Sequence, residues 1–267
     1  MSPAVEVVRR RFAEPPKPFT DKVAKLGLSD AAVLNSNNPS PELNAAETDV
    51  TVVGGGIHAL IYAIHTRCFD PKIDAASKKV DKPINISVIE KNTRPGHKIG
   101  ESTLPPFSLW MKMLGFNGET LLRIFGMKDG LNFYTFDKHN QGEYSEFASN
   151  GPPALFLAGF QVERPISELF LTLVAQRRGI NVYHGHQVDV KNTKLSVAGN
   201  TVPVYPVDAG KSSDPTAQIN CPLVIDGTGR FRQFSSKAAR IHRFEGFNTN
   251  ATWSYWKCTD ETKINIR

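Results

Sequence analysis

The chain has 267 residues, 40% of them hydrophobic and 22% charged, with a formal net charge of +6. This length can hold one large α/β domain or two small ones, and the composition is that of a soluble globular protein. No uninterrupted apolar run is long enough to span a bilayer, so we expect no membrane partner. The basic residues are scattered, without an aromatic-basic signature, so we expect no nucleic acid partner. A phosphate-bearing cofactor, or simple solubility, explains the charge equally well.

The cysteines and histidines show no metal-binding pattern. Cys68, Cys221 and Cys258 have neither metal-ligand spacing nor an even count, which fits a reducing compartment and predicts a cytoplasmic location. His184 and His186 alternate along one predicted strand without a third ligand, which is more typical of surface histidines. We therefore expect no metal site.

Residues 1–47 are rich in proline, asparagine, serine and charge, as in the stretches 14–19 and 35–41. This composition predicts a flexible N-terminal extension that carries no chemistry. Its basic run at 7–12 is flanked by Glu6 and Glu14, so a mitochondrial presequence is poorly supported. The folded domain is expected to cover residues 48–267.

The stretch 48–65 is typical of a dinucleotide-binding first turn. Its valines at 50–53 predict a buried parallel strand, and the residues from 59 to 64 predict a helix. Between them, Gly54 can form the tight turn, and Gly56 lacks the Cβ that would keep the backbone away from a pyrophosphate. Ala59 is the third small residue, which lets the helix lie close to the strand. Alone, this pattern is a weak signal.

A second strand, Ile84–Glu90, supports the dinucleotide interpretation because it ends in an acid that can accept hydrogen bonds from a ribose. Glu90 follows Gly56 by 34 positions, where about 20 is usual. The polar, proline-bounded stretch 69–83 accounts for the delay as a surface insertion. A solvated charge at the strand end is the alternative role for Glu90.

The next segments alternate between long loops and short elements. The loop 91–106 is long for a compact domain, which indicates a functional role. A helix is predicted from the prolines at 105 and 106 to Leu114, and a shorter one over 119–125. Strands at 131–136 and 144–147 are then predicted to pair as a hairpin.

The second half of the chain predicts a helix and a return to the sheet. Residues 161–178 have apolar residues at helical spacing and a glycine after them. A strand is predicted at 180–184, and a small meander near Val188 and Val202, with a flexible loop at 210–216. The run 222–230 is a strand that ends in glycines.

In that last run, Asp226 can accept from a cofactor hydroxyl or hold the turn. Gly227 and Gly229 let the backbone come near a ligand.

Three stretches together resemble the flavin-dependent halogenases, especially the fungal branch that acts on phenolic substrates. The glycine turn at 54–59 and the turn Asp226–Gly229 are shared with the wider group of FAD monooxygenases. The stretch Gly100–Pro106 is narrower, because it is similar to the Gly-Glu-Ser/Ala loop that passes over the flavin in halogenases. The implied fold is an α/β, FAD-binding, Rossmann-like domain of the aromatic-hydroxylase type with a small antiparallel sheet on the substrate side.

Lys128 stands where halogenases place their essential lysine, just before a strand. In that family the lysine meets hypohalous acid formed at the flavin and positions the oxidised halogen beside the substrate. A lysine suits this task because it carries a charge and rotatable donors on a flexible stem. The alternative is an exposed lysine in a helix-to-strand turn.

The resemblance implies FAD as the cofactor, with Gly54, Gly56 and Glu90 at its adenosine-diphosphate half. The other implied contacts are Ala59, Arg164, Asp226 and Gly227. For Arg164, a salt bridge at the start of the helix is the competing role. The implied partners are a small aromatic substrate, free or carrier-bound, a halide and a separate flavin reductase.

The implied activity is the electrophilic chlorination of an electron-rich aromatic carbon. The segment 247–257 resembles the aromatic strand of these halogenases, although a plain core strand would look the same. The chain ends before the Trp-x-Trp-x-Ile-Pro signature, so a C-terminally truncated protein is expected. An aromatic hydroxylase that does not need Lys128, or a truncated FAD-binding remnant without catalysis, remain alternatives.

Overall fold

The computed structural model describes residues 43, 46–69, 83–114, 116, 121–122, 124–128, 130–137, 142–149, 159–207, 215, 217–235, 245–246, 252 and 254. Three predictions fall wholly or mostly outside these residues. They are the surface insertion at 69–83, the loop at 210–216 and the aromatic strand at 247–257. Most of the predicted extension at 1–47 also lies outside them.

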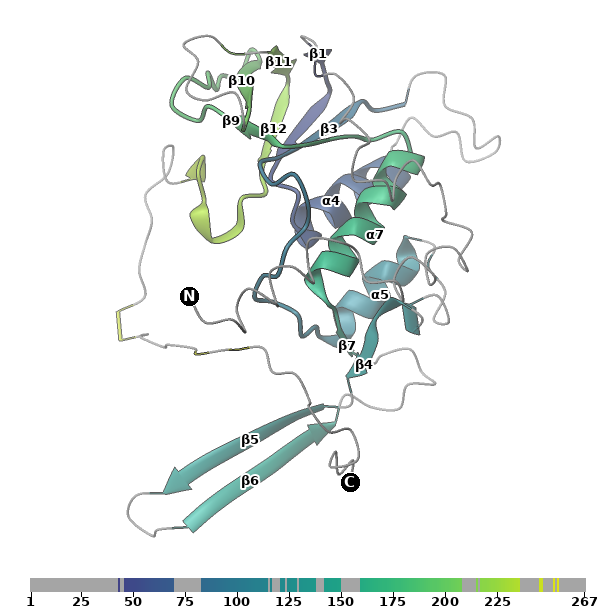
Figure 1. Ribbon diagram of the computed structural model, residues 1–267, viewed down its shortest axis with the longest axis vertical. Coiled ribbons are helices and arrows are strands. Elements are labelled where there is room, and N and C mark those ends of the chain that lie inside the picture. The colour runs from purple at the N-terminus through teal and green to yellow at the C-terminus, as the bar shows by residue number, and fades with distance from the viewer. Residues whose placement is uncertain are drawn as a thin grey trace, which may run out of the picture.

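A four-stranded parallel sheet forms the centre of the fold (Figure 1). Its strands, in spatial order, are β12 (Leu223–Asp226), β2 (Val50–Val53), β3 (Ile86–Glu90) and β8 (Asn181–His184). All residues of β2 and β3 are buried, as expected for parallel strands covered on both faces. The prediction of these four strands is confirmed.

Helices cover one face of this sheet. Helix α4 (Ile57–Cys68) packs against α7 (Arg164–Arg177), and α5 (Pro105–Met113) lies beyond them in Figure 1. Apolar side chains of the three helices and the sheet form one buried cluster, which includes Leu60, Val88, Met111 and Leu171. This cluster fixes α4 directly behind the glycine turn that follows β2.

A second sheet carries the other hydrophobic cluster. Its order is β1 (Ala46–Glu47), β11 (Ala217–Cys221), β10 (Asn200–Pro206) and β9 (His186–Val188). Strand β10 pairs antiparallel with β9 and β11, which confirms the predicted meander, whereas β1 pairs parallel with β11. Ala46 and Glu47 come from the segment expected to be flexible, so its last residues belong to the folded part.

The helix starts follow the prolines, with one difference from the prediction. Helix α5 begins at Pro105 as predicted. Helix α7 begins at Arg164, with Pro165 in its first turn, and not at Gln161. Gln161 instead ends strand β7 (Gly159–Gln161). Gln161 is extended because it pairs with Gly126 of β4 (Gly126–Lys128), and Glu163, the N-cap of α7, is extended as well.

The predicted hairpin is confirmed. Strands β5 (Gly130–Asp137) and β6 (Gly142–Ser149) pair antiparallel, and Figure 1 shows them extending away from the parallel sheet. Residues 121, 122 and 124 are helical, in the region of the predicted short helix. Among the described residues, every helix is too short or too polar to cross a membrane.

Candidate active site

The glycine turn after β2 interlocks with the turn after β12. Gly54 has a φ of +104°, and a methyl group there would lie 2.7 Å from the carbonyl carbon of Gly227. The Gly227 N–H donates to Val53 O at 2.8 Å, and a methyl group on Gly227 would lie 2.8 Å from Ala59 Cβ. These three small residues therefore let two strand ends and helix α4 approach each other closely.

Gly56 differs from them because a methyl group there would make only ordinary van der Waals contacts. Its backbone is extended, with φ −71° and ψ 166°, and a methyl group there would have Arg164 Nη2 as its nearest neighbour at 3.7 Å. Gly56 is the N-cap of α4, which has no side-chain cap and no acidic residue in its first turn. A helix N-terminus without a side-chain cap fits a phosphate group, because its first N–H groups can donate to an anion. The residues present therefore fit a dinucleotide.

We expect Gly56→Ala to weaken dinucleotide binding without unfolding the protein. The methyl group meets no atom closer than 3.7 Å within the protein, so stability should change by less than about 0.5 kcal/mol. At the N-terminus of α4 this methyl group would occupy the space of a phosphate, so FAD affinity should fall by roughly tenfold or more. Fluorescence titration with FAD measures this. Gly126→Ala, whose methyl group would lie 3.6 Å from Gln161, is the matched control.

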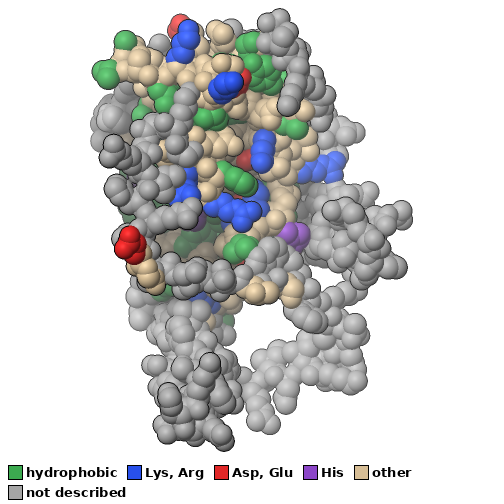
Figure 2. All heavy atoms as spheres, turned by 90° about the vertical axis from the view of Figure 1, so that its left-hand side faces the viewer, with side chains coloured by type: hydrophobic (Ala, Val, Ile, Leu, Met, Phe, Trp, Pro, Cys, Tyr) green, Lys and Arg blue, Asp and Glu red, His purple; other side chains and the backbone are tan. Residues whose placement is uncertain are grey.

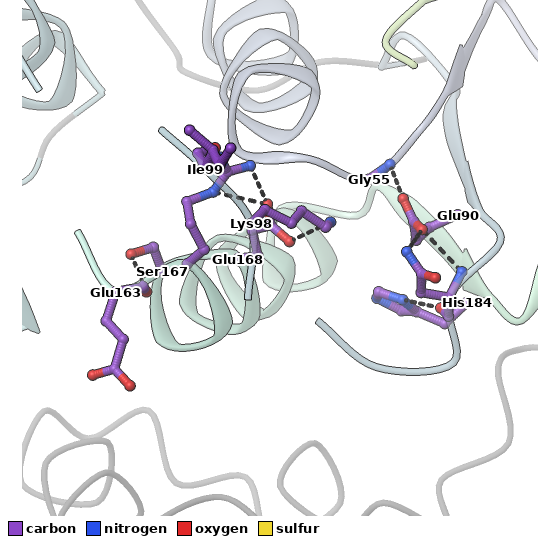
Figure 3. Close-up of polar contacts among 10 residues, drawn as sticks. Gly55, Glu90, Lys98, Ile99, Glu163, Ser167, Glu168 and His184 are labelled. Carbon is purple, nitrogen blue, oxygen red and sulfur yellow. Dashed lines mark hydrogen bonds and ion pairs between the residues drawn. The ribbon is translucent and has the colours of Figure 1, made fainter. Parts of the chain in front are cut away.

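Glu90 is 7% exposed and ties β3 to the glycine turn. Its Oε2 accepts from Gly55 N at 2.6 Å, and its Oε1 accepts from Asn92 N at 2.9 Å and Asn92 Nδ2 at 2.6 Å (Figure 3). The alternative role of Glu90 as a solvated charge at the strand end is therefore wrong. Because each carboxylate oxygen can accept more than one hydrogen bond, a ribose contact stays a prediction.

His184 supports this arrangement from the neighbouring strand. It pairs with Glu90 in register, and its Nδ1 lies 3.2 Å from Asn92 O. Burial lowers the pKa of His184, which outweighs the opposing effects of the Asn92 carbonyl and the Glu90 charge. The neutral ring then donates from Nδ1 to Asn92 O, so His184 helps to hold the residue that fixes Glu90.

Asp226 holds the turn after β12. Its Oδ1 accepts from Thr228 N at 3.1 Å and Thr228 Oγ1 at 2.5 Å, and its Oδ2 accepts from Phe234 N at 2.9 Å and Ser235 N at 3.1 Å. Burial raises the pKa of Asp226, but these hydrogen bonds together hold it below its usual value. Of its two predicted roles, the structure shows the turn-holding one, and a cofactor contact stays a prediction.

These bonds predict an acid-sensitive contribution to stability. Because the folded-state pKa is depressed, the ionised carboxylate stabilises the fold above about pH 4 and loses this effect as the pH falls through the folded pKa. Asp226→Asn should cost about 1 to 3 kcal/mol at pH 7, since an amide nitrogen cannot accept from Phe234 and Ser235. Urea unfolding at pH 7 and pH 3 measures this. An unchanged difference between wild type and variant at the two pH values would contradict the prediction.

Arg164 lies at the start of α7 and forms the helix-start salt bridge that was one of its two predicted roles, while a cofactor contact stays a prediction. It is 8% exposed, forms an ion pair with Glu168, and donates from Nη1 to Ile99 O at 2.9 Å. Its Nη2 would also lie 3.7 Å from a methyl group placed on Gly56. Glu168 also pairs with Lys98, whose Nζ lies 2.8 Å from Glu168 Oε2 (Figure 3). The Arg164 guanidinium thus adds a positive charge beside the N-terminus of α4.

Sequence reasoning missed Lys98 and Glu168. The spacing of four between Arg164 and Glu168 on a predicted helix is a signal that could have identified the carboxylate. No local pattern identifies Lys98, because its partner lies 70 positions away.

Lys128 is 4% exposed, so the alternative of an exposed turn lysine is wrong. It ends β4, and its Nζ donates to Thr103 O at 2.9 Å. Thr103 belongs to the Gly-Glu-Ser-Thr loop and is bound to β7 by its N–H, which donates to Phe160 O at 2.9 Å. Its hydroxyl also lies 2.7 Å from Phe160 N, which donates to it. The structure therefore brings Lys128 to the loop that the resemblance connected with the flavin.

Basic side chains mark one face of the molecule. Figure 2 shows Lys and Arg side chains across the centre of the face that carries the turn after β12. On this turn, exposed Phe231 lies beneath Lys91 Nζ, 5.1 Å from the ring centroid, and Arg230, at 5.3 Å. Such a surface attracts an anionic ligand such as a diphosphate.

Comparisons with known proteins show similarity to halogenases. Residues 49–157 match the family model described as tryptophan halogenase. The curated flavin-dependent halogenase malA of Malbranchea aurantiaca is 51% identical over 247 residues, which cover 92% of this chain and 35% of that protein. The chain thus resembles flavin-dependent halogenases over most of its length. It spans about a third of the length of the curated halogenases that it matches.

Solved structures confirm the fold of the chain. A flavoprotein/dehydrogenase of Cytophaga hutchinsonii superposes with a TM-score of 0.52 and 20% identity, covering 72% of this chain and 41% of that one. The myxobacterial chondrochloren halogenase CndH gives a TM-score of 0.51 and 20% identity, covering 67% of this chain and 37% of its own. The predicted α/β flavoprotein fold with small antiparallel sheets is thus confirmed.

Proposed function

We propose that this protein is an FAD-dependent halogenase that chlorinates an electron-rich aromatic substrate. The proposal includes oxygen, a halide and reduced FAD supplied by a separate reductase, and a small aromatic substrate that is free or carrier-bound. The 51% identity to a curated flavin-dependent halogenase and the match to the tryptophan halogenase model support the reaction class. The free thiols Cys68 and Cys221 among the described residues support a location in the cytoplasm.

The turn after β2 and the N-terminus of α4 together form what we call the glycine cradle. The cradle would hold FAD by its adenosine-diphosphate half. The N-terminus of α4 at Gly56 and the Arg164 guanidinium would bind phosphate oxygens. Glu90, at the end of β3, would accept from a ribose hydroxyl. Gly54, Ala59 and Gly227 would act by letting the two turns approach, and Asp226 by shaping the second turn. When bound, reduced FAD would supply the oxygen chemistry that oxidises the halide.

Lys128 would hold the oxidised halogen beside the substrate. Its amine is fixed at one position by Thr103 O, and its surroundings exclude water because the side chain is 4% exposed. A fixed donor in a dry site stabilises a polar transition state more strongly than a solvated one does. The observation that carries the proposal is this buried lysine, joined through a single loop to a glycine cradle that fits a dinucleotide.

Titration of the purified protein with FAD tests the proposal first, followed by turnover of a phenolic substrate with and without chloride. We expect saturable binding that quenches flavin fluorescence, and a chlorinated product that requires chloride. Riboflavin, which lacks the adenosine-diphosphate half, is the matched ligand and should bind at least about 100-fold more weakly. A hydroxylated product formed equally without halide would favour the aromatic hydroxylase instead. Failure of the folded protein to bind FAD would overturn both.

A further inference from the structure

Two cationic side chains from distant segments share one buried carboxylate. Glu168 is 1% exposed, and its Oε2 lies 2.8 Å from Lys98 Nζ, while its Oε1 accepts from Arg164 Nε at 3.1 Å (Figure 3). A single negative charge thus holds two positive charges together. Its removal would leave Lys98 and Arg164 without the negative charge that offsets their mutual repulsion.

This triad fixes the beginning of the loop that leads to Lys128. Lys98 is bound to α7 by its side chain, and the next residue is bound by its backbone, since Ile99 O accepts from Arg164 Nη1 at 2.9 Å. Gly100 follows with a φ of +100°, and a methyl group there would lie 3.2 Å from Arg164 Nη1. Three consecutive residues of the loop are therefore packed on Arg164 and Glu168.

The other end of the same loop carries the lysine contact. Thr103 O accepts from Lys128 Nζ at 2.9 Å, and Val162 N donates to Glu101 O at 2.6 Å. Only residues 100–102 separate Ile99 from Thr103, which limits the span to roughly 14 Å. Such a short, hydrogen-bonded segment has little freedom to adjust, so a displacement at Lys98 would be passed on to Thr103.

We propose that Glu168 is a positioning residue for Lys128. Its carboxylate anchors the loop 98–103 on α7, and the anchored loop keeps the lysine amine buried at Thr103 O. The inference rests on the proposed function only in taking Lys128 as the catalytic residue. Because Arg164 also faces Gly56, the same carboxylate connects the dinucleotide cradle with the position of the lysine.

The test measures the accessibility of Lys128 in protein without added FAD. Brief acetylation with acetic anhydride, followed by peptide mass spectrometry, gives the reaction rate of each lysine. Glu168→Gln keeps the shape of the side chain and removes its charge. We expect it to raise the acetylation rate of Lys128 by about tenfold, because the loop opens locally. Lys98→Met should raise the rate by a smaller factor, since Arg164 keeps its partner.

Two controls separate this effect from unfolding. Glu163→Gln removes an exposed carboxylate next to Arg164, which Figure 3 shows pointing away from the triad, and should leave Lys128 protected. Cys221, 4% exposed in the second hydrophobic cluster, reports the intact fold through its slow reaction with a thiol reagent. The variants should leave the rate of Cys221 unchanged.

An unchanged acetylation rate of Lys128 in Glu168→Gln, with Cys221 protected, would overturn the proposal. If Glu168→Gln also exposes Cys221, Lys98→Met decides, because its side chain is 32% exposed and its loss should leave the fold intact. In that variant, faster acetylation of Lys128 with Cys221 protected supports the proposal, and an unchanged rate overturns it. The acetylation measurement needs no cofactor. Failure of FAD binding would therefore contradict the proposed function without affecting the conclusion about Glu168.

Discussion

Lys128→Ala should reduce the rate of halogenation by roughly 10²-fold to 10³-fold or more, the range found when one fixed donor is removed from an active site. The side chain is 4% exposed and its Nζ has a fixed acceptor in Thr103 O, so no neighbouring solvent molecule reproduces its position. FAD affinity should stay within about twofold, because the lysine lies on β4 and not on the glycine cradle. Chlorinated product per minute and an FAD titration give the two values.

Two controls accompany this variant. Lys128→Met keeps most of the buried volume and removes the charge, so an equal loss of rate would assign the effect to the amine and not to a cavity. Lys194→Ala removes an exposed lysine of the second sheet and should halogenate at the wild-type rate. Full turnover by Lys128→Ala would remove the halogenase mechanism and leave the aromatic hydroxylase as the better description.

Gly54→Ala should unfold the protein or destabilise it by on the order of 3 to 5 kcal/mol. The backbone at Gly54 has a φ of +104°, which alanine adopts only with strain. The new methyl group would also lie 2.7 Å from the carbonyl carbon of Gly227, and backbone atoms in two paired strands cannot move aside easily. A loss of this size is a large part of the whole free energy of unfolding of a domain.

Urea unfolding followed by circular dichroism measures this loss, and Gly56→Ala is the matched control two residues away. Gly56 has an ordinary negative φ, and a methyl group there would make only ordinary van der Waals contacts, so its substitution should affect dinucleotide binding and not stability. Equal midpoints for the two variants would show that the turns after β2 and β12 are less tightly packed than the distances indicate.

The local pattern of the sequence determined the elements of this protein. Val50–Val53 and Ile86–Glu90 are β-branched runs, and such runs predict buried parallel strands wherever they occur. Pro105 and Pro165 mark helix starts because proline lacks the N–H that an interior helical position needs. The same reasoning placed the tight turn at Gly54, whose positive φ the structure contains. These properties depend on a few neighbouring residues, so a short window of sequence carries them.

Local sequence patterns predicted only part of the candidate site. The resemblance to halogenases singled out Lys128 and Arg164, but it gave neither the burial of the lysine nor the partners of the arginine. Local periodicity also extended the long helix back to Gln161, because a periodic pattern does not show that β4 pairs with this residue. Pairing in a sheet is decided by a strand that lies elsewhere in the chain.

Tertiary structure alone decided how the functional groups meet. Lys128 reaches Thr103 across 25 positions, Glu90 reaches Gly55 across 35, and Lys98 reaches Glu168 across 70. Each contact needs a particular strand register and helix packing before the two side chains can face each other, and a charged residue has no local preference that reveals its partner. The sequence by itself therefore determined the strand, glycine turn and helix at residues 50–68 and predicted a catalytic role for Lys128. Packing of distant segments determined that one loop, anchored by a buried carboxylate, joins them.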